Sequence, residues 1–443
     1  MAFQESGVSK ILARFGEIVE WWNKDLISNQ ISPHFFLYPA EMMIEKGFDV
    51  EVLTKFSPIG NEKLQEKNNG INVFRASRPT FPFLLLRHML KKDYFLIHMH
   101  SLSPMEQIMV WILSRIRRIP VVYTSHWIVF PERFGSQTSK YLSAAIYNVL
   151  LRIGDWRLGA FTAFTEFQAE IYRRYGIRNV HVIPHGFDLQ VFEAPKNPHA
   201  EAKFEAMAHN ILCVGVISPR KGQLLLVRGM SKIIKEYPST RLFLVGRAFG
   251  KSQIEYEKKL KLEIQKRKLE KNVSILENVG KEDLVQLYLM SDLFALPTEF
   301  EAFALVFLEA MAAGLPIVST DFPPMNRILR NWQTALLVKR EEEMVTEAIL
   351  TLLGDSGLRR RLGWNAKQEV KQKYGLDKVK KEYWNLYGKL SREAAGCRKT
   401  CSTRYWTIAS SHMPPMNHSE ESVQRLNELF HDLSSEEYPH SLI

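Results

Sequence analysis

Short apolar runs alternate with longer amphipathic segments along most of this chain. Runs rich in β-branched and aromatic residues are typical of buried strands, and apolar positions spaced three and four residues apart indicate helices. In the first half the pattern predicts helices, including 104–117 and 140–153, and strands at 10–15, 49–53, 72–75, 94–99, 121–124 and 181–183. Such alternation is the signature of βαβ units built around a parallel sheet.

A polar stretch at 193–208 interrupts the alternation and is predicted to be a linker. Beyond it the pattern predicts charged helices at 341–353, 357–374 and 376–390, and strands at 211–214, 242–245, 273–276, 293–296 and 317–319. We therefore expect an α/β protein of two Rossmann-like, doubly wound domains, 1–192 and 209–375, that face each other across a cleft. Ligands of such sheets bind at the carboxyl ends of the strands.

The segment that follows the second domain has a different character. The helix at 376–390 is expected to cross back to the first domain. Residues 391–443 have no sustained apolar period, apart from a short helical pattern at 423–433, and we expect them to form a mobile tail without a catalytic role.

The composition of the 443 residues is that of a soluble globular protein, with 46% hydrophobic and 24% charged residues. The most apolar stretch, 302–318, is interrupted by Glu309 and Gly314, so it does not resemble the roughly 18 uninterrupted apolar residues of a membrane-spanning helix. The N-terminus lacks the basic, apolar and small-residue pattern of a secretory signal. We therefore exclude an integral membrane protein, a secreted disulfide scaffold and a disordered chain.

The net charge limits the kinds of binding partner that we expect, and the cysteine content indicates the redox state of the compartment. The net charge of +11 favours an anionic partner: a nucleic acid, a phosphorylated small molecule or a membrane surface. No recognised nucleic-acid-binding motif accompanies this charge, so we expect no nucleic acid partner. The three cysteines cannot build a disulfide framework, and Cys397 and Cys401 have no second ligand pair beside them. We therefore expect reduced thiols in a cytoplasm and no metal site.

The strongest local signal is the segment from Leu296 to Pro316, where a buried strand, a loop carrying Glu301 and a helix carrying Glu309 follow one another. The unpaired N–H groups at a helix start bind phosphate without a side chain. A sugar nucleotide lying over this helix end would meet one carboxylate near each of its hydroxyl-bearing ends. Alternatively, Glu301 is a structural cap and Glu309 a satisfied half-buried residue, and the spacing alone favours neither interpretation.

Two further positions are candidates for binding chemistry. Arg220 and Lys221 lie in a glycine-bounded turn after the first strand of the second domain, where they either neutralise a leaving diphosphate or form a solvated surface pair. His126 follows an apolar strand of the first domain, where an imidazole can bridge donor and acceptor groups, although a lone histidine is more often structural. Histidines near other strand ends or loops carry less weight: His34, His98, His100 and His185.

Together these segments resemble the retaining, nucleotide-sugar-dependent glycosyltransferases of family 4, which have the GT-B fold of two Rossmann-like domains. The resemblance runs from about residue 33 to residue 390. It rests on the order and spacing of several parts: His126, IPHGFD at 183–188, PRKG at 219–222, LVG at 244–246, the Glu301 and Glu309 pair, and LEAMAAGLP at 308–316.

The resemblance implies a role for each site residue. Glu309 is expected to hold the ribose hydroxyls, Glu301 to contact the transferred sugar and Lys221 to pair with the diphosphate. The remaining donor contacts are expected from Arg220, Gly246 and the backbone N–H groups near Phe303, Ala304, Leu305 and Val306. His126 is expected to contact the donor sugar from the first, acceptor-side domain, so that His126, Glu301 and Lys221 form the catalytic set. Catalysis would be mainly leaving-group stabilisation, without a metal, as the acceptor attacks the face that the diphosphate leaves.

Four departures from the family pattern affect the donor site. Val216 stands where the family usually has arginine, and Arg220 is a candidate substitute. Alanine replaces glycine at 302 and 304, which is tolerable only if those backbones keep a negative φ. Arg327 reverses a charge in the family's Gly-Gly-x-x-Glu stretch, and residues 20–35 take the place of the N-terminal glycine-rich loop.

Residues 81–92 and 111–118 are both basic and apolar. Such surfaces dock on anionic lipid, which would suit a lipid-linked acceptor, but core-facing helices with solvated cationic ends show the same pattern. The leading hypothesis is a cytoplasmic glycosyltransferase, peripheral at the inner face of the cell membrane if these helices dock there. It would transfer a sugar from a nucleotide donor to a glycan or a lipid-linked acceptor. The rivals are an epimerase on the same fold and an impaired GT-B protein that only binds a nucleotide sugar or glycan, the latter motivated by Val216 and Arg327.

Overall fold

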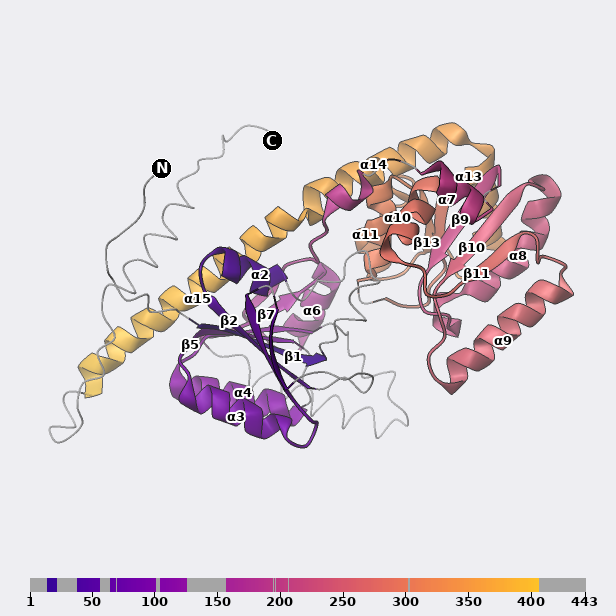
Figure 1. The fold of residues 1–443 in the computed structure, drawn as a ribbon. Coiled ribbons are helices and arrows are strands. Elements are labelled where there is room, and N and C mark those ends of the chain that lie inside the picture. Colours follow the sequence, from indigo (N-terminus) through magenta and orange to yellow (C-terminus); the bar gives the residue numbers. More distant parts are fainter. Residues whose placement is uncertain are drawn as a thin grey trace, which may run out of the picture.

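The computed structural model describes residues 14–21, 38–55, 64–68, 70–100, 104–125, 157–193, 195, 197–205, 207–301 and 303–405. These residues form two sheets, one in each half of the chain, with helices packed on both faces of each (Figure 1). No helix in these ranges is long and apolar enough to cross a membrane.

The first sheet has eight strands in the order β3-β4-β2-β1-β5-β6-β7-β8. The strands are β1 Arg14–Trp21, β2 Asp49–Lys55, β3 Gln65–Asn68, β4 Ile71–Ala76, β5 Tyr94–His100, β6 Val121–Thr124, β7 Gly159–Ala163 and β8 Val180–Val182. Only the edge strand β3 runs antiparallel to its neighbour. The helices around the sheet are α2 Tyr38–Glu45, α3 Phe81–Lys91, α4 Pro104–Arg117 and α6 Glu166–Arg174. One apolar core contains α2 residues and a separate one contains residues of α3, α4 and α6, so these helices cover opposite faces.

The second sheet has six parallel strands in the order β11-β10-β9-β12-β13-β14. They are β9 His209–Val214, β10 Thr240–Val245, β11 Val273–Leu276, β12 Leu293–Leu296, β13 Ile317–Thr320 and β14 Ala335–Val338. The helices around this sheet are α8 Gln223–Glu236, α9 Lys251–Lys266, α10 Lys281–Met290, α11 Leu305–Ala313, α12 Met325–Ile328, α13 Glu342–Gly354 and α14 Ser356–Tyr374. Numbered from β9, this is the 3-2-1-4-5-6 order of a dinucleotide-binding sheet, which reverses direction between β9 and β12.

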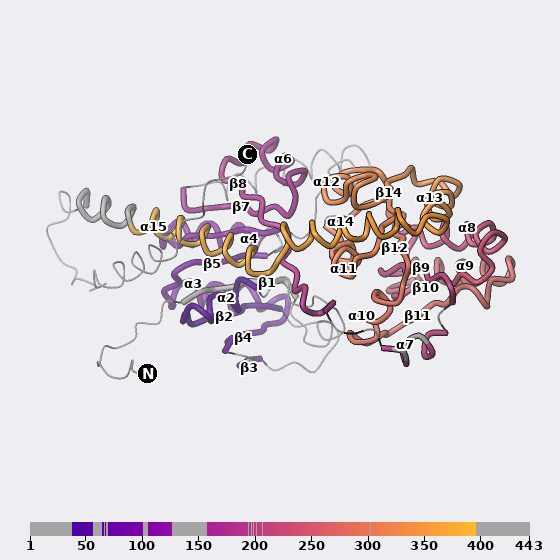
Figure 2. The backbone as a smooth tube through the Cα atoms, turned by 90° about the horizontal axis from the view of Figure 1, so that it is seen from above, coloured from indigo at the N-terminus to yellow at the C-terminus, as the bar shows by residue number. Residues whose placement is uncertain are grey.

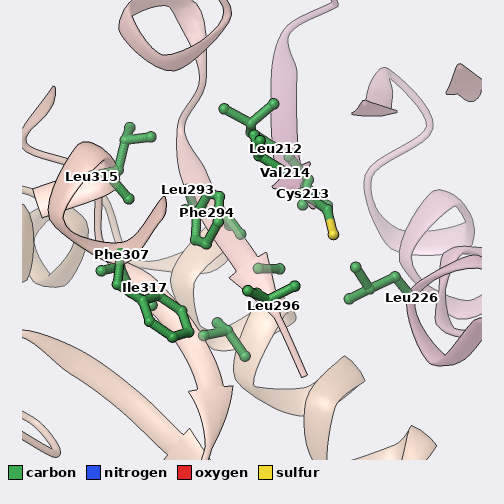
Figure 3. Close-up of a cluster of buried hydrophobic side chains, with 14 of the residues drawn as sticks. Leu212, Cys213, Val214, Leu226, Leu293, Phe294, Leu296, Phe307, Leu315 and Ile317 are labelled. Carbon is green, nitrogen blue, oxygen red and sulfur yellow. The ribbon is translucent and has the colours of Figure 1, made fainter. Parts of the chain in front are cut away.

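Apolar side chains bury both faces of the second sheet. Figure 3 shows Leu212 and Val214 of β9 beside Phe294 and Leu296 of β12, and the ring of Phe307 of α11 packs against that of Phe294 at a centroid distance of 5.9 Å. Strands covered on both faces read as near-continuous apolar runs, which explains why the sequence pattern located this sheet well.

The two halves are joined by short elements and by one long helix. Between the sheets lie η2 Leu189–Phe192 and α7 Pro198–Lys203, so the polar stretch predicted as a linker contains a short helix. The last helix, α15 Leu376–Tyr405, leaves the second half and runs along the first (Figure 2). Lys380 of α15 forms an ion pair with Glu45 at 2.7 Å, and Tyr387 is hydrogen-bonded to His98 at 2.7 Å.

Several elements differ from the sequence-based expectation. β1 begins at Arg14 and ends at Trp21, later than the predicted 10–15, because its parallel register with β2 and β5 covers these later residues. β3, β7 and β14 were not predicted from the sequence pattern. α15 continues to Tyr405, past the predicted helix end at 390 and into the segment expected to be a tail. The helix predicted at 140–153 and the helical pattern at 423–433 lie outside the described residues.

Candidate active site

The strand order of the second sheet reverses between the neighbouring strands β9 and β12, which end at Val214 and Leu296. In doubly wound sheets, ligands bind in a crevice outside the carboxyl ends of the strands at such a reversal, and we use the word crevice for this region. The two loops meet there, because Glu299 N–H donates to the carbonyl of Arg220 at 2.7 Å. We take this crevice as the candidate site.

Glu301 is the centre of a compact charge cluster in the crevice. Its Oε1 accepts from Lys221 Nζ at 2.6 Å, from Arg220 Nη1 at 2.7 Å and from Thr298 Oγ1 at 3.0 Å. The side chains of Lys221 and Glu301 are only 9% and 10% exposed, whereas that of Arg220 is 41% exposed. The cluster therefore has a buried ion pair at its base and a second cation at its mouth.

Close backbone contacts fix the loops of the crevice, and two of them require glycine. Gly222 has φ +77°, and a Cβ there would lie 2.3 Å from the carbonyl oxygen of Pro297. Gly246 follows β10 with φ +151°, and a Cβ there would lie 2.0 Å from the carbonyl oxygen of Gly215. Any side chain at either position would push the loops apart. Gly246 thus lies at the site, in contact with the loop after β9.

Arg340 binds both the loop after β9 and the loop after β12. It follows β14 and donates from Nε to the carbonyl of Pro297 at 3.0 Å and from Nη2 to that of Pro219 at 2.6 Å. Hydrogen bonds from a charged guanidinium are stronger than those between neutral groups, so Arg340 fixes the position of the two loops. Sequence reasoning did not single out Arg340, because it did not predict β14. A basic residue just after the carboxyl end of that strand would have pointed to the site.

Helix α11 starts at the edge of the crevice and directs its N-terminus into it. Phe303 precedes the helix, Ala304 is its N-cap, and Leu305 and Val306 supply its first N–H groups. The first N–H groups of an α-helix have no partner within the helix and can bind an anion. Ala304 has φ +48° and ψ 82°, so the condition of a negative φ, under which alanine would be tolerated here, is not met. The turn before the helix imposes the left-handed conformation that glycine adopts more easily.

Phe303 also connects the crevice to the first half of the chain. Its ring packs against His185 and Phe164, with centroid distances of 4.9 and 5.9 Å, and the rings of His185 and Phe164 stack at 3.7 Å. His185 and Phe164 follow strands of the first sheet. The sequence analysis gave His185 little weight. In the structure its ring packs on Phe303, which follows Glu301 by two residues in the chain.

Glu309 is buried in α11 and accepts a hydrogen bond from the hydroxyl of Tyr288 at 2.7 Å. Burial raises the pKa of Glu309 to about 7, and the hydrogen bond from Tyr288 opposes that rise. Its carboxyl group therefore holds a proton more readily than an exposed glutamate does. No sequence pattern pointed to Tyr288, which comes from α10.

The first sheet carries its own polar cluster at the carboxyl ends of β5 and β6. His98 bonds through Nε2 to Thr124 at 2.7 Å and through Nδ1 to Tyr387 of α15 at 2.7 Å. Burial lowers the pKa of the neighbouring His100 to about 3, so its ring stays neutral. His126, the predicted contribution of this sheet to catalysis, lies outside the described residues, as does His34.

The described residues contain no group of three His, Cys, Asp or Glu side chains placed to hold a metal ion. Val216 is half-buried, and its carbonyl accepts from Gln223 at 2.9 Å. Arg327, on the short helix α12, is exposed.

Comparison with known protein families identifies both halves of the chain. The family model described as "Glycosyltransferase Family 4" matches residues 36–191, and the one described as "Glycosyl transferases group 1" matches residues 197–369. The chain belongs to family 4 of the GT-B glycosyltransferases. The family and the fold of two Rossmann-like domains, both predicted from the sequence, are confirmed.

Individual relatives of this family 4 glycosyltransferase are distant but nearly full-length. An uncharacterized glycosyltransferase of Methanocaldococcus jannaschii is 27% identical over 81% of this chain and 93% of its own. A D-inositol 3-phosphate glycosyltransferase of Nocardia farcinica is 26% identical over 75% of this chain and 79% of its own. The solved structure of HepE from Anabaena in complex with UDP has a TM-score of 0.65 at 20% identity, and the match covers 85% of this chain and 99% of that one.

In this glycosyltransferase the structure brings together most of the residues predicted for the donor site. Lys221, Arg220 and Glu301 touch one another, and Gly246 and the residues from Phe303 to Val306 border the same crevice. Glu309 lies further inside α11, bonded to Tyr288. Thr298, Arg340 and Tyr288 support these residues and were not singled out by sequence reasoning.

Proposed function

We propose that this glycosyltransferase transfers a sugar from a nucleoside diphosphate donor to a glycan or lipid-linked acceptor, with retention of the anomeric configuration. The observation that carries the proposal is the cluster of Lys221, Arg220 and Glu301 beside the N-terminus of α11. Two cations and a helix N-terminus bind a diphosphate, and an adjacent carboxylate binds sugar hydroxyls. The likeness to a structure solved with UDP supports a nucleotide donor of this kind.

Each donor group has a counterpart in the crevice. The diphosphate pairs with Lys221 and Arg220 and with the N–H groups of Leu305 and Val306. The transferred sugar contacts Glu301, and the ribose hydroxyls reach Glu309. Arg220 replaces the arginine that the family has at the position of Val216. Its guanidinium and the ammonium of Lys221 both bind the same oxygen of Glu301, so the two cations lie side by side. His126 contacts the sugar from the first domain.

In the transfer step the bond between the anomeric carbon and the diphosphate oxygen breaks. The acceptor oxygen bonds to the same face of that carbon, and the acceptor proton leaves with the diphosphate. The main catalytic effect is stabilisation of negative charge on the leaving diphosphate. Lys221, Arg220 and the α11 N-terminus supply positive charge for this purpose, so we propose that no metal or other cofactor is required.

We propose that the reaction takes place in the cytoplasm. The thiol of Cys213 is free and buried, and burial raises its pKa to about 12. A chain with three cysteines and a free buried thiol fits a reducing compartment.

Release of nucleoside diphosphate from candidate sugar nucleotides, measured in the presence of a chelator, tests the proposal. Wild type is expected to turn over one donor selectively. Lys221→Ala should lose turnover about 100-fold, as when one stabilising donor is removed from a transition state. Arg220→Ala should lose about tenfold, because Arg220 is the more exposed cation.

The matched control is Lys259→Ala, which removes an exposed cation of α9 outside the loops after β9 and β12 and should leave turnover unchanged. Binding of a sugar nucleotide without any release would support the rival, an impaired protein that only binds its ligand. Wild-type turnover in Arg220→Ala would make that residue a surface group. The anomeric configuration of the product, read by nuclear magnetic resonance, decides retention.

A further inference from the structure

Helices α3 and α4 carry several large apolar side chains that are exposed to solvent. Of the thirteen large hydrophobic residues exposed in the described part of the chain, six lie on these two helices: Phe83, Leu86, Leu90, Met105, Ile112 and Ile116. Phe83 and Ile116 are each 71% exposed and Met105 is 73% exposed. Scattered single apolar residues are ordinary on a surface, but such a concentration marks an interaction site.

The exposed residues of both helices form one surface. One side of each helix packs on the first sheet, where an apolar core contains Phe81, Leu85 and Met89 of α3 and Val110 and Trp111 of α4. The exposed apolar residues lie on the other side of each helix, away from the sheet. The helices lie next to each other on the outside of that sheet (Figure 1). Their ends are joined because Arg117 of α4 donates to the carbonyls of Met89 and Leu90 at 2.7 Å.

The same surface is strongly cationic. Residues 78–118 contain seven lysines and arginines but only two acidic residues, Asp93 and Glu106. Asp93 pairs with Arg117, and the buried Glu106 pairs with Lys55 at 2.9 Å. Arg87 and Lys91 lie exposed among the apolar residues of α3, and Arg115 lies exposed beside Ile116 at the end of α4.

We propose that this α3–α4 face, made of the six apolar residues together with Arg87, Lys91 and Arg115, docks on an anionic lipid bilayer. The apolar side chains enter the headgroup boundary while the cations pair with lipid phosphates, as in amphipathic helices that lie on membranes. Apolar contact alone would suit another protein, but the excess of cations selects a negatively charged surface. The inference does not depend on sugar transfer, because the face is on the outside of the first sheet and the donor crevice is in the second.

Cosedimentation of the full chain with lipid vesicles tests this proposal. Wild type is expected to bind vesicles that contain phosphatidylglycerol and to release them at high salt, and to bind pure phosphatidylcholine vesicles far more weakly. Two double variants separate the contributions: Arg87→Gln with Lys91→Gln removes charge, and Phe83→Ser with Ile116→Ser removes apolar area. Each should lower partitioning by about tenfold or more.

The matched control is Leu262→Ser with Lys259→Gln on α9, which removes one exposed apolar residue and one exposed lysine elsewhere. Its binding should equal that of wild type. No binding of wild type to anionic vesicles, or equal binding by all variants, would overturn the proposal. Binding to duplex DNA that the charge variant loses, without vesicle binding, would assign the face to nucleic acid instead. Unchanged melting temperatures of the variants would show that each is folded, which separates failure of docking from failure of the donor site.

Discussion

The carboxyl group of Glu309 is held inside the second domain, where its protonation depends on the fold. Burial raises its pKa to about 7 from an ordinary 4.5, against the hydrogen bond from Tyr288. A ribose that donates two hydroxyl groups would favour the charged form. The residue is therefore poised to ionise fully when a nucleotide binds.

Stability should depend on pH through this residue. Because the pKa in the folded chain is raised, the folded state holds the proton more tightly than the unfolded chain does. This stabilisation is fully present below the unfolded pKa of 4.5 and is lost as the pH rises through about 7, and it amounts to about 3 kcal/mol. We expect the melting temperature of wild type to fall relative to that of Glu309→Gln as the pH is raised across this window. A difference independent of pH would contradict the raised pKa.

Nucleotide affinity should also depend on Glu309. Glu309→Ala removes the acceptor of the ribose hydroxyls and should weaken binding of a nucleoside diphosphate by about 10- to 100-fold, the value of hydrogen bonds to a charged group. Calorimetry measures this directly. Glu299→Ala, in the exposed part of the preceding loop, serves as the control and should bind normally. Unchanged affinity in Glu309→Ala would remove the ribose assignment.

The backbone conformation of Ala304 can be tested by the sign of the stability change on substitution by glycine. With φ at +48°, the alanine pays for a left-handed conformation that glycine adopts freely. Ala304→Gly should therefore stabilise the protein by about 1 kcal/mol in chemical unfolding. At a helical φ the same change would cost about 1 kcal/mol. Destabilisation would thus show that the residue belongs to the helix and that the N-terminus of α11 begins earlier.

At the scale of elements, α15 is the feature that ties the two halves together. It shares an apolar core with the first sheet through residues such as Trp384 and Leu390. One buried chain of polar groups also crosses this contact, from Tyr387 to His98 to Thr124 and on to Thr162. Both ring nitrogens of His98 are used in this chain. A buried polar group that loses its partner is costly, so the position of α15 depends on Tyr387.

Tyr387→Phe should lower the free energy of unfolding by about 1–3 kcal/mol, because it leaves His98 Nδ1 without its partner at nearly unchanged volume. Ser391→Ala on the same helix is the control, since Ser391 only bonds back to the Tyr387 carbonyl one turn earlier. It should leave stability unchanged within about 0.5 kcal/mol. Equal effects of the two changes would mean that α15 is held by packing alone.

The elements also show what a sequence can predict. β6, β11, β12 and α4 have the predicted bounds. β7, with the small residues of GAFTA, was missed, and β14 was missed although its sequence ALLV is as apolar as that of β12; both are paired in parallel with a neighbouring strand. β14 in turn places Arg340, so the missed strand hid a residue of the site.

At the scale of the whole molecule, pairs distant in sequence could not be inferred from one chain. Glu301 and Lys221 were each predicted at the donor site, because each follows a strand of the second domain, but their direct contact at 2.6 Å was not predicted. Nothing local indicated that Tyr288 meets Glu309, that Phe303 packs on His185, or that Tyr387 reaches His98. These contacts depend on how the sheets and α15 pack against one another, which no local period reports.

The central claim is that the crevice binds a nucleoside diphosphate sugar. A thermal-shift screen of the full chain against nucleoside diphosphates and their common sugar conjugates, without added metal, tests it most directly. A ligand that binds only the folded state raises its stability by mass action. We predict that one sugar nucleotide raises the melting temperature of wild type selectively and that Glu309→Ala and Lys221→Ala lose this shift. No shift with any nucleotide at about millimolar concentration, where even a weak donor should register, would contradict the account.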